Sequence, residues 1–513
     1  MKTATSVGRR LRLLALAALA LSFSVAADSL PEVIHSRIGS QSEGVAGSLK
    51  MTVRDKRQQY SGADRRTFDL DINSPKSVTF SRDGRRFYVN SLEGCRTVVY
   101  SSDSLKKLKV IKYEFPSSKG PLWAAPSGYY PFTHYENGAD RRFFGKPVEE
   151  AWSHGGRYLW IPFYRRSFDI NAQDPSAVAV IDTRVDSIVR MFETGPLPKM
   201  VAASPDGRLL AVTHWGDNTV GLLDISSDDP GRWHHLPPIA IGSKLNLDYS
   251  LTEPVNRDSK SGYLLRGTLF TPDSRYLLVS GMAGPLSVID VRDHKYLGQV
   301  GRLYGIRHLA IAEDGMIYGS RNVAGEVVAF RLDSLVSAIE RAKKAGSRSI
   351  NPGDKLLTCK VGRGARTLAL SPDGRYVFVA CNSASALYAV DRLAMKVVDR
   401  ISIDSYPVGL AISPDGRQLI VTSQGRDHRG GNAVNILDID RPDLPEPTPI
   451  VVEEPADSVA ADSIPASVAQ SATRKTLFGF DLNAVYIAAG LTLLLVAVLV
   501  ATFAILSRRN RRR

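Results

Sequence analysis

Five basic side chains occupy the same position of a segment that recurs along this 513-residue chain. If the recurring segments close into a ring, these side chains meet at one end of it. Five like charges held together repel one another unless water or an anion lies between them. Arginine also offers a planar fork of donors that matches carboxylate and phosphate groups. The pattern therefore predicts anion binding by Lys76, Lys199, Arg266, Arg307 and Arg366.

The recurring segment has seven copies, each with two short apolar runs around a turn such as Pro-Asp-Gly. Such runs are typical of a β-hairpin, and most copies continue into a third apolar run that ends in Asp. The closest copies are 41 and 42 residues apart, and four strands in about 40 residues make one propeller blade. The basic residue is second in its copy, and two copies have Val148 and Val408 there. The copies begin at Pro75, Pro147, Pro198, Leu265, Ile306, Ala365 and Pro407.

These copies predict an all-β fold, a seven-bladed β-propeller over residues 66–440 that follows an N-terminal extension over residues 28–65. Residues 66–73, RTFDLDIN, precede the first copy as RISIDSY precedes the seventh. We therefore expect an N-terminal strand closure in which residues 66–73 form the outer strand of the last blade. Such a closure removes the exposed edges of the sheet.

The motif SPDGR, followed by an apolar strand and then by TVGLLD or LSVID, resembles the YVTN-type seven-bladed β-propellers. That family is related to lactonase-like and cytochrome d1-type propellers. The resemblance covers residues 66–440 and implies the architecture, and it allows a lactonase-like activity. The chain departs from the tetrapeptide that names the family, with Val89-Asn90, Val212-Thr213 and Val379-Ala380-Cys381 in the corresponding places.

Both ends of the chain carry membrane-related patterns. Residues 1–27 have the order of a signal peptide, with basic residues, an apolar run and then two alanines. A Pro-, Ala- and acid-rich stalk is expected over residues 441–480, then a single transmembrane helix over 481–507 and a basic cytoplasmic tail over 508–513. This topology places the propeller on the periplasmic or extracellular side of the inner or plasma membrane. Most of the formal charge of +14 belongs to the part between these ends, which favours acidic partners.

Loops that follow the second strand of each blade are expected to surround the same end of the ring. They carry further basic and aromatic residues, a combination that suits phosphate, carboxylate or stacked bases. Each of these residues taken alone is more typical of a solvated loop. The loop candidates for ligand binding are Arg165, Arg166, His214, Trp215 and Arg321, and His308 is added from the inner strand of the fifth copy.

Searches for catalytic and cofactor motifs are largely negative: no nucleophile elbow, Walker loop or HExxH occurs, and we expect no cofactor and no metal. Glu149, Glu150 and His308 are the nearest candidates for a hydrolytic set. Three cysteines do not form a paired framework. An aromatic insert over residues 112–147 is expected either to cap the basic ring and contact ligand or to pack over it as a plug.

Three functions stay open. The first is a membrane-anchored, non-enzymatic binding module that captures an anionic small molecule, a polyanion or an envelope protein at the channel mouth. The second is a lactonase-like hydrolase that acts on an anionic lactone. The third is a protein-docking platform that uses the aromatic insert, and nucleic acid is a further class of partner that basic charge alone would permit.

Overall fold

The computed structural model describes residues 33–44, 49–60, 62–115, 117–130, 143–166, 174–246, 255–353, 355–425 and 429–441, and four residues near the C-terminus. The chain divides into two compact units, residues 1–444 and 445–513. In the second unit, β31 (Thr476–Leu477) pairs with β32 (Phe480–Asp481). No helix among the described residues is long and apolar enough to span a membrane. The signal peptide and residues 482–507 of the transmembrane segment lie outside those residues and stay predictions.

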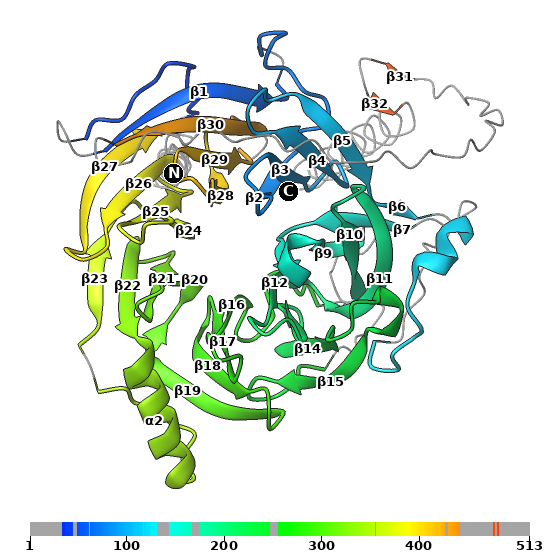
Figure 1. Cartoon of the computed structure of the whole chain (residues 1–513), viewed down its shortest axis with the longest axis vertical. Coiled ribbons are helices and arrows are strands. Elements are labelled where there is room, and N and C mark those ends of the chain that lie inside the picture. The colour runs from blue at the N-terminus through cyan, green and yellow to red at the C-terminus, as the bar shows by residue number, and fades with distance from the viewer. Residues whose placement is uncertain are drawn as a thin grey trace, which may run out of the picture. The chain divides into compact units, whose positions relative to one another are not determined.

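Seven antiparallel sheets stand around a common centre in the described part of the first unit, and in all but the second the first strand of the blade lies nearest the centre (Figure 1). This arrangement confirms the seven-bladed β-propeller. Blades one, three and four have, from inner to outer strand, β2 (Pro75–Phe80), β3 (Arg86–Ser91), β4 (Arg96–Ser101) and β5 (Lys107–Lys112); β12 (Pro198–Ala203), β13 (Leu209–His214), β14 (Thr219–Asp224) and β15 (His234–Ala240); and β16 (Leu265–Phe270), β17 (Tyr276–Gly281), β18 (Gly284–Asp290) and β19 (Lys295–Tyr304).

Blades five to seven follow the same order. They consist of β20 (Ile306–Ile311), β21 (Met316–Arg321), β22 (Glu326–Arg331) and β23 (Leu357–Lys360); β24 (Ala365–Leu370), β25 (Tyr376–Cys381), β26 (Ala386–Asp391) and β27 (Lys396–Ser402); and β28 (Pro407–Ile412), β29 (Gln418–Ser423), β30 (Ala433–Asp440) and β1 (Lys50–Gln58).

The second blade departs from this pattern at its inner strand. Its inner strand is split into β7 (Phe143–Pro147) and β8 (Ala151–Ser153), both of which pair with β9 (Tyr158–Arg166). The blade continues outward through β10 (Pro175–Asp182) and β11 (Ser187–Pro196). Residues 148–150 therefore lie in a break of the inner strand. Because of this break, the residue of the second blade that faces the centre differs from the one that the alignment of the copies predicts.

The repeated SPDGR turn has a local hydrogen-bond basis. In the first blade the Ser81 hydroxyl donates to Asp83 Oδ1, and the same oxygen accepts the backbone N–H of Arg85 at 3.1 Å. Gly84 follows the aspartate with φ 71°, a left-handed conformation that favours glycine. The turn thus fixes the hairpin between the inner and second strands. The same aspartate-to-backbone bond recurs at Asp206, Asp273, Asp314, Asp373 and Asp415.

Apolar side chains fill the space between adjacent blades. Between the second and third blades, for example, Trp160 and Phe192 pack with Leu223 and Trp233. One buried cluster of this kind lies at each of the seven junctions in the described residues. A single blade exposes two apolar faces, and only neighbours on both sides bury them. Each repeat therefore buries its apolar faces only when it has a neighbour on both sides. Cys359 and Cys381 are buried at one of these junctions.

The strand that closes the ring is β1, so the prediction that residues 66–73 would close it is wrong. β1 pairs antiparallel with β30 from Lys50 opposite Asp440 to Gln58 opposite Ala433. It therefore lies within residues 28–65, where we expected only an extension. Two of the three alternating apolar residues of residues 66–73 face solvent, since Phe68 and Leu70 are 44% and 67% exposed, while Ile72 is buried between the seventh and first blades.

The described half of the aromatic insert lies at the rim of the second blade. β6 (Glu114–Phe115) pairs with β7, and the short helix η1 (Ser117–Leu122) leads to Trp123, which forms a bridge with Met191 of the outer strand. Figure 1 shows η1 outside the ring, beside β11. The described residues of the insert thus do not cover the centre. Residues 131–142 lie outside the described residues.

The outer edge of the fifth blade carries a helix, α2 (Leu332–Lys344), between its third and fourth strands. Leu335, Ala338, Ile339 and Ala342 are buried against the junction of the fourth and fifth blades. The remaining short helices, η2 (His154–Gly156) and η3 (Pro230–Arg232), belong to turns of the second and third blades.

Candidate functional site

A bulge marks the start of the inner strands, and the predicted basic residues lie in it. The pairing of inner and second strands shifts register directly after the first residue of each inner strand. A bulge leaves the extra residue outside the hydrogen-bond ladder and redirects its side chain. The structure thus brings all five predicted bases to one level of the ring. We call the residue in each such bulge the ring residue; in blades one, three, four, five and six it is Lys76, Lys199, Arg266, Arg307 and Arg366.

A hydrogen bond between blades fixes the backbone of several ring residues. The hydroxyl of Thr422, in the second strand of blade seven, donates to the carbonyl oxygen of Lys76 at 2.8 Å. Ser320 and Thr213 donate in the same way to the carbonyls of Arg366 and Arg266 in the next blade. The backbone carbonyl of each of these ring residues therefore has a hydrogen-bond donor in the neighbouring blade, and the side chain is not needed for this contact.

The ring residue of the second blade is Glu149, not Val148. Asn90, in the second strand of blade one, donates to the Glu149 carbonyl at 3.2 Å, as Thr213 does to the ring residue of blade four. Val148 is instead buried, with 1% of its surface exposed. The alignment on proline misses this shift because the break between β7 and β8 inserts one residue before the ring position.

Glu149 neutralises one of the five bases. The Arg266 guanidinium donates to Glu149 Oε1, in a pair whose side chains are 4% and 14% exposed. Arg266 belongs to blade four and Glu149 to blade two, so the pair reaches past blade three. Ring residues from non-adjacent blades therefore meet at the centre.

Three ring residues form no ion pair with any acidic side chain among the described residues: Lys76, Arg307 and Arg366. The closest polar partner of the Lys76 ammonium is Gln424 Oε1 at 3.3 Å, and Arg307 Nη1 lies 3.5 Å from the sulfur of Met282. The buried Nε atoms of Arg307 and Arg366 have no hydrogen-bond partner. These donors are available to an anion that enters the centre.

Burial and mutual repulsion disfavour the charged forms of these groups. Burial, together with the charge of Arg266, lowers the pKa of Arg366 to about 10. Burial, followed by the charges of Arg366, Arg266 and Arg307, holds the pKa of Lys76 well below that of a free lysine. The site is therefore electrostatically strained without a counter-ion, and a bound anion would relieve that strain.

Lys199 is the ring residue that the surrounding loops sequester. Its ammonium lies 3.7 Å from the centre of the Tyr164 ring and 4.7 Å from that of Trp215. Asp258 Oδ1 is 3.6 Å from the same nitrogen, and Asp258 also accepts from Arg165 and from the Tyr164 hydroxyl. Cation–π contact and the carboxylate together stabilise this lysine.

Asp258 is a residue that the sequence analysis missed. It belongs to a polar insert between the third and fourth blades in which no motif marks it. The structure also brings together two of the predicted loop residues, Arg165 and Trp215, since Trp215 Nε1 donates to the Asp258 carbonyl at 3.3 Å.

Other predicted site residues lie elsewhere or are already paired. His214 is fully buried between strands, where its Nε2 accepts from the Gly195 N–H at 3.1 Å, so its predicted place at the channel mouth is wrong. Arg321 pairs with Glu326 within the fifth blade, at 3.0 Å. For Arg166 the structure gives the backbone, which pairs with Gly145.

Two further groups beside the ring could take part in proton transfer. Burial raises the pKa of Glu150 well above its usual range, and Glu149 raises it further, whereas a hydrogen bond from Ser77 opposes the shift. Burial lowers the pKa of His308 to about 4. Burial therefore favours the protonated form of Glu150, whereas His308 is neutral at neutral pH. Within the described residues, no cluster of His, Cys, Asp or Glu is suited to hold a metal ion.

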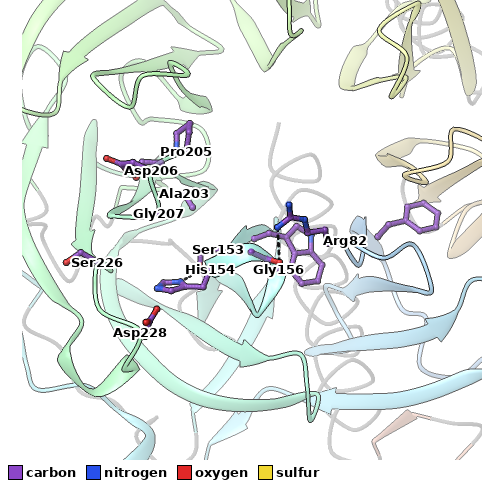
Figure 2. Close-up of a pocket in the computed structure, with 14 residues that line it drawn as sticks. Arg82, Ser153, His154, Gly156, Ala203, Pro205, Asp206, Gly207, Ser226 and Asp228 are labelled. Carbon is purple, nitrogen blue, oxygen red and sulfur yellow. Dashed lines mark hydrogen bonds between the residues drawn. The ribbon is translucent and has the colours of Figure 1, made fainter. Parts of the chain in front are cut away.

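A second concavity, of about 680 Å³, lies at the opposite ends of the inner strands of blades one to three (Figure 2). It forms where the second blade replaces the Pro-Asp-Gly turn by His154-Gly155-Gly156. Arg82 is the basic residue that lines it, and Asp206 and Asp228 are the acidic ones. Its lining therefore lacks the positive excess of the ring residues.

The pair of Glu149 and Arg266 leads to a prediction for stability. We expect Glu149→Gln to lower the free energy of unfolding by about 3 kcal/mol, because it leaves a buried guanidinium among like charges. Urea denaturation of the single variant and of Glu149→Gln with Arg266→Met would measure this. Recovery of most of the loss in the double variant is expected. A loss below about 1 kcal/mol in the single variant would contradict the role of Glu149 as the internal counter-ion.

No protein-family model matches this sequence. Antigen Lp49 from Leptospira interrogans serogroup Icterohaemorrhagiae serovar copenhageni (strain Fiocruz L1-130) is 24% identical over 284 residues, which cover 51% of this chain and 53% of that protein. The match thus spans about half the length of this curated relative.

Two solved structures are similar in architecture. Hydrazine synthase from Kuenenia stuttgartiensis has a TM-score of 0.48 at 14% identity and covers 75% of this chain and 100% of its own. The β-propeller domain of Cps50 (Swd1) from Myceliophteria thermophila has a TM-score of 0.46 at 15% identity and covers 71% and 96%. These likenesses concern the fold alone, and the YVTN-type family stays a prediction.

Proposed function

We propose that this protein is a binding module that captures an anionic ligand or an acidic partner at the centre of its propeller. The observation that carries the proposal is the set of Lys76, Arg307 and Arg366, which share one level of the ring and form no ion pair within the described residues. Unpaired charges are costly when buried, so a fold that keeps three of them together needs a compensating ligand.

The chemical class follows from the donors. Guanidinium groups bind carboxylate and phosphate oxygens through paired hydrogen bonds, and a lysine adds a point charge. Tyr164 and Trp215 hold Lys199 between their rings, and Arg165 is joined to this group through Asp258. We therefore favour a small carboxylated or phosphorylated molecule, or an acidic side chain of a partner protein.

We further propose that the propeller acts outside the cytoplasm and is anchored to the membrane. The proposal rests on the signal-peptide pattern of residues 1–27 and on the uncharged residues 482–505, which are followed by five arginines near the C-terminus. Residues 441–480 would then hold the propeller away from the bilayer.

Ligand-induced stabilisation tests the binding proposal. The full chain is heated at low salt with citrate, inorganic pyrophosphate or an acidic glycan, and in parallel with spermidine as a cation of similar charge. A binder at 100 times its Kd raises the free energy of unfolding by about 2.7 kcal/mol. We expect stabilisation by at least one anion, and we expect added salt to weaken it. Equal responses to anions and to spermidine, or none to any anion, would refute the proposal.

A hydrolase of anionic lactones is a second candidate, which the raised pKa of the buried Glu150 beside the ring favours. A neutral carboxyl can donate a proton to a leaving oxygen, as in other enzymes with a buried acid. Turnover of a panel of carboxylated lactones, and its loss in Glu150→Gln, would support this function. Absence of turnover, together with unchanged anion binding, would refute the hydrolase and support the binding module.

The affinity for sulfate is expected to rise as the pH falls from about 7.5 to about 5. The pKa of His308 is lowered to about 4 by burial, and a bound anion favours its protonated form, so binding takes up a proton. The rise is at most about tenfold per pH unit for each linked proton. Sulfate keeps its charge over this range, which makes it a suitable probe. The charged groups that face His308 are Glu149, Arg266, Arg307 and Arg366.

Calorimetric titration at several pH values, with His308→Gln as the control, measures this dependence. The variant is expected to lose the part of the rise below about pH 6, which His308 contributes. An affinity that falls with decreasing pH would contradict the assignment.

A further inference from the structure

The two lysines of the ring have different surroundings. Lys199 is buried between two aromatic rings, with the carboxylate of Asp258 at 3.6 Å, although burial and the charges of Arg266 and Arg307 hold its pKa well below that of a free lysine. Lys76 is partly exposed, and the polar group closest to its nitrogen is the neutral amide oxygen of Gln424. Among the described residues, only Lys199 has an acidic partner of its own.

Burial, and then the cations around Lys76, lower its pKa and favour its neutral amine. Arg366, Arg266 and Arg307 are the basic groups that act on it, and Glu149 is the acidic one, which Arg266 already engages. A lysine beside other cations loses its proton more readily, and the neutral amine is the nucleophilic form. The Gln424 oxygen accepts an N–H from either form. Lys76 is thus an amine that is both accessible and placed beside anion-binding groups.

We propose that Lys76 forms an imine with the carbonyl carbon of an α-keto acid whose carboxylate is held by Arg307 and Arg366. This proposal deepens the proposed function, on which it rests, because it names the substrate class of the same anion site. Two guanidinium groups would orient the carboxylate, and orientation next to the amine is what raises the rate of such an addition.

The step balances without an oxidant or reductant. The Lys76 nitrogen attacks the carbonyl carbon and forms a C–N bond, which gives a carbinolamine. Loss of the hydroxyl as water, with the two protons that the amine supplies, gives the imine. The products are one imine and one water molecule, and hydrolysis reverses the step.

Reductive trapping tests the imine directly. The full chain is incubated with pyruvate and cyanoborohydride at neutral pH, and digested peptides are analysed by mass spectrometry. Lys107 is the matched control within the same protein, because hydrogen bonds to Asp69 and Asp71 raise its pKa. We expect Lys76 to be modified at least tenfold faster than Lys107, and excess sulfate to slow the modification of Lys76 alone. Modification of Lys76 at the rate of Lys107 would overturn the proposal.

A second measurement separates this proposal from the one on which it rests. Lys76→Arg removes the nucleophilic amine, so this variant is expected to give no fast adduct, while anion binding is measured on the wild type by calorimetry with sulfate and with pyruvate. Sulfate binding by the wild type without fast trapping at Lys76 leaves the anion site standing and refutes the imine. Absence of both refutes the two proposals together. A fast adduct that persists in Lys76→Arg would assign the reactive amine to another lysine and also refute this one.

Discussion

Replacing Arg307 and Arg366 together by methionine is expected to abolish anion binding and, in the same variant, to raise the free energy of unfolding. Each guanidinium offers hydrogen bonds to a charged ligand, and such bonds contribute about 1.5–3 kcal/mol each. Loss of two therefore weakens binding at least about 100-fold. Without ligand, the same groups are buried charges that repel Arg266 and Lys76. Apolar replacements of similar length remove that repulsion and gain about 1–4 kcal/mol.

Opposite changes in binding and stability distinguish a binding site from a structural network. Calorimetric titration with the anion found by the stabilisation assay gives the first quantity, and urea denaturation gives the second. Arg321→Met is the matched control, because Arg321 is paired with Glu326 in the fifth blade and has no place in the site. We expect this control to bind as the wild type does. A double variant that is destabilised, or that binds normally, would show that these arginines serve the fold.

The repeat alone was sufficient to predict the fold and the level of the ring at which the bases lie. Each SPDGR copy has both a hydrogen-bonded turn and two apolar strands, so local and tertiary signals agree. The phase of Lys76, Lys199, Arg266, Arg307 and Arg366 within the copies followed from that alignment. The spacing of the seven copies was therefore sufficient to predict that these side chains lie at the same level of the ring.

The acidic partners of the basic ring residues could not be predicted from the sequence. Glu149 occupies the ring position because the second inner strand breaks at residues 148–150. No feature of the PVEE segment indicates that the ring position is shifted there by one residue. Asp258 reaches Lys199 from an irregular insert, whose path depends on tertiary contacts. His214 was misplaced for a related reason, since its position at the end of a second strand suggested a loop although neighbouring blades bury it.

Charges introduced into β1 are expected to unfold the propeller, whereas the same charges in residues 66–73 should be tolerated. Met51 and Val53 are fully buried in the junction of the sixth and seventh blades, so Met51→Asp with Val53→Asp places two unpaired carboxylates there. Their combined cost exceeds the few kcal/mol that hold a typical domain together. Loss of β1 would also leave β30 as an unpaired edge, which promotes aggregation. Circular dichroism and size-exclusion chromatography would detect this loss.

Two matched pairs of substitutions decide which segment closes the ring. Lys50→Arg with Thr52→Lys places cations on the other face of β1, opposite Asp440 and Asp438, and should leave the protein folded. Phe68→Asp with Leu70→Asp alters the segment that the sequence pattern favoured, and exposed substitutions of this kind usually change stability by less than about 0.5 kcal/mol. Alternation of apolar residues is common to both segments, but Met51 and Val53 are fully buried whereas Phe68 and Leu70 are exposed. Unfolding by the Phe68 and Leu70 pair, with a folded Met51 and Val53 pair, would reverse this assignment and restore residues 66–73 as the closing strand.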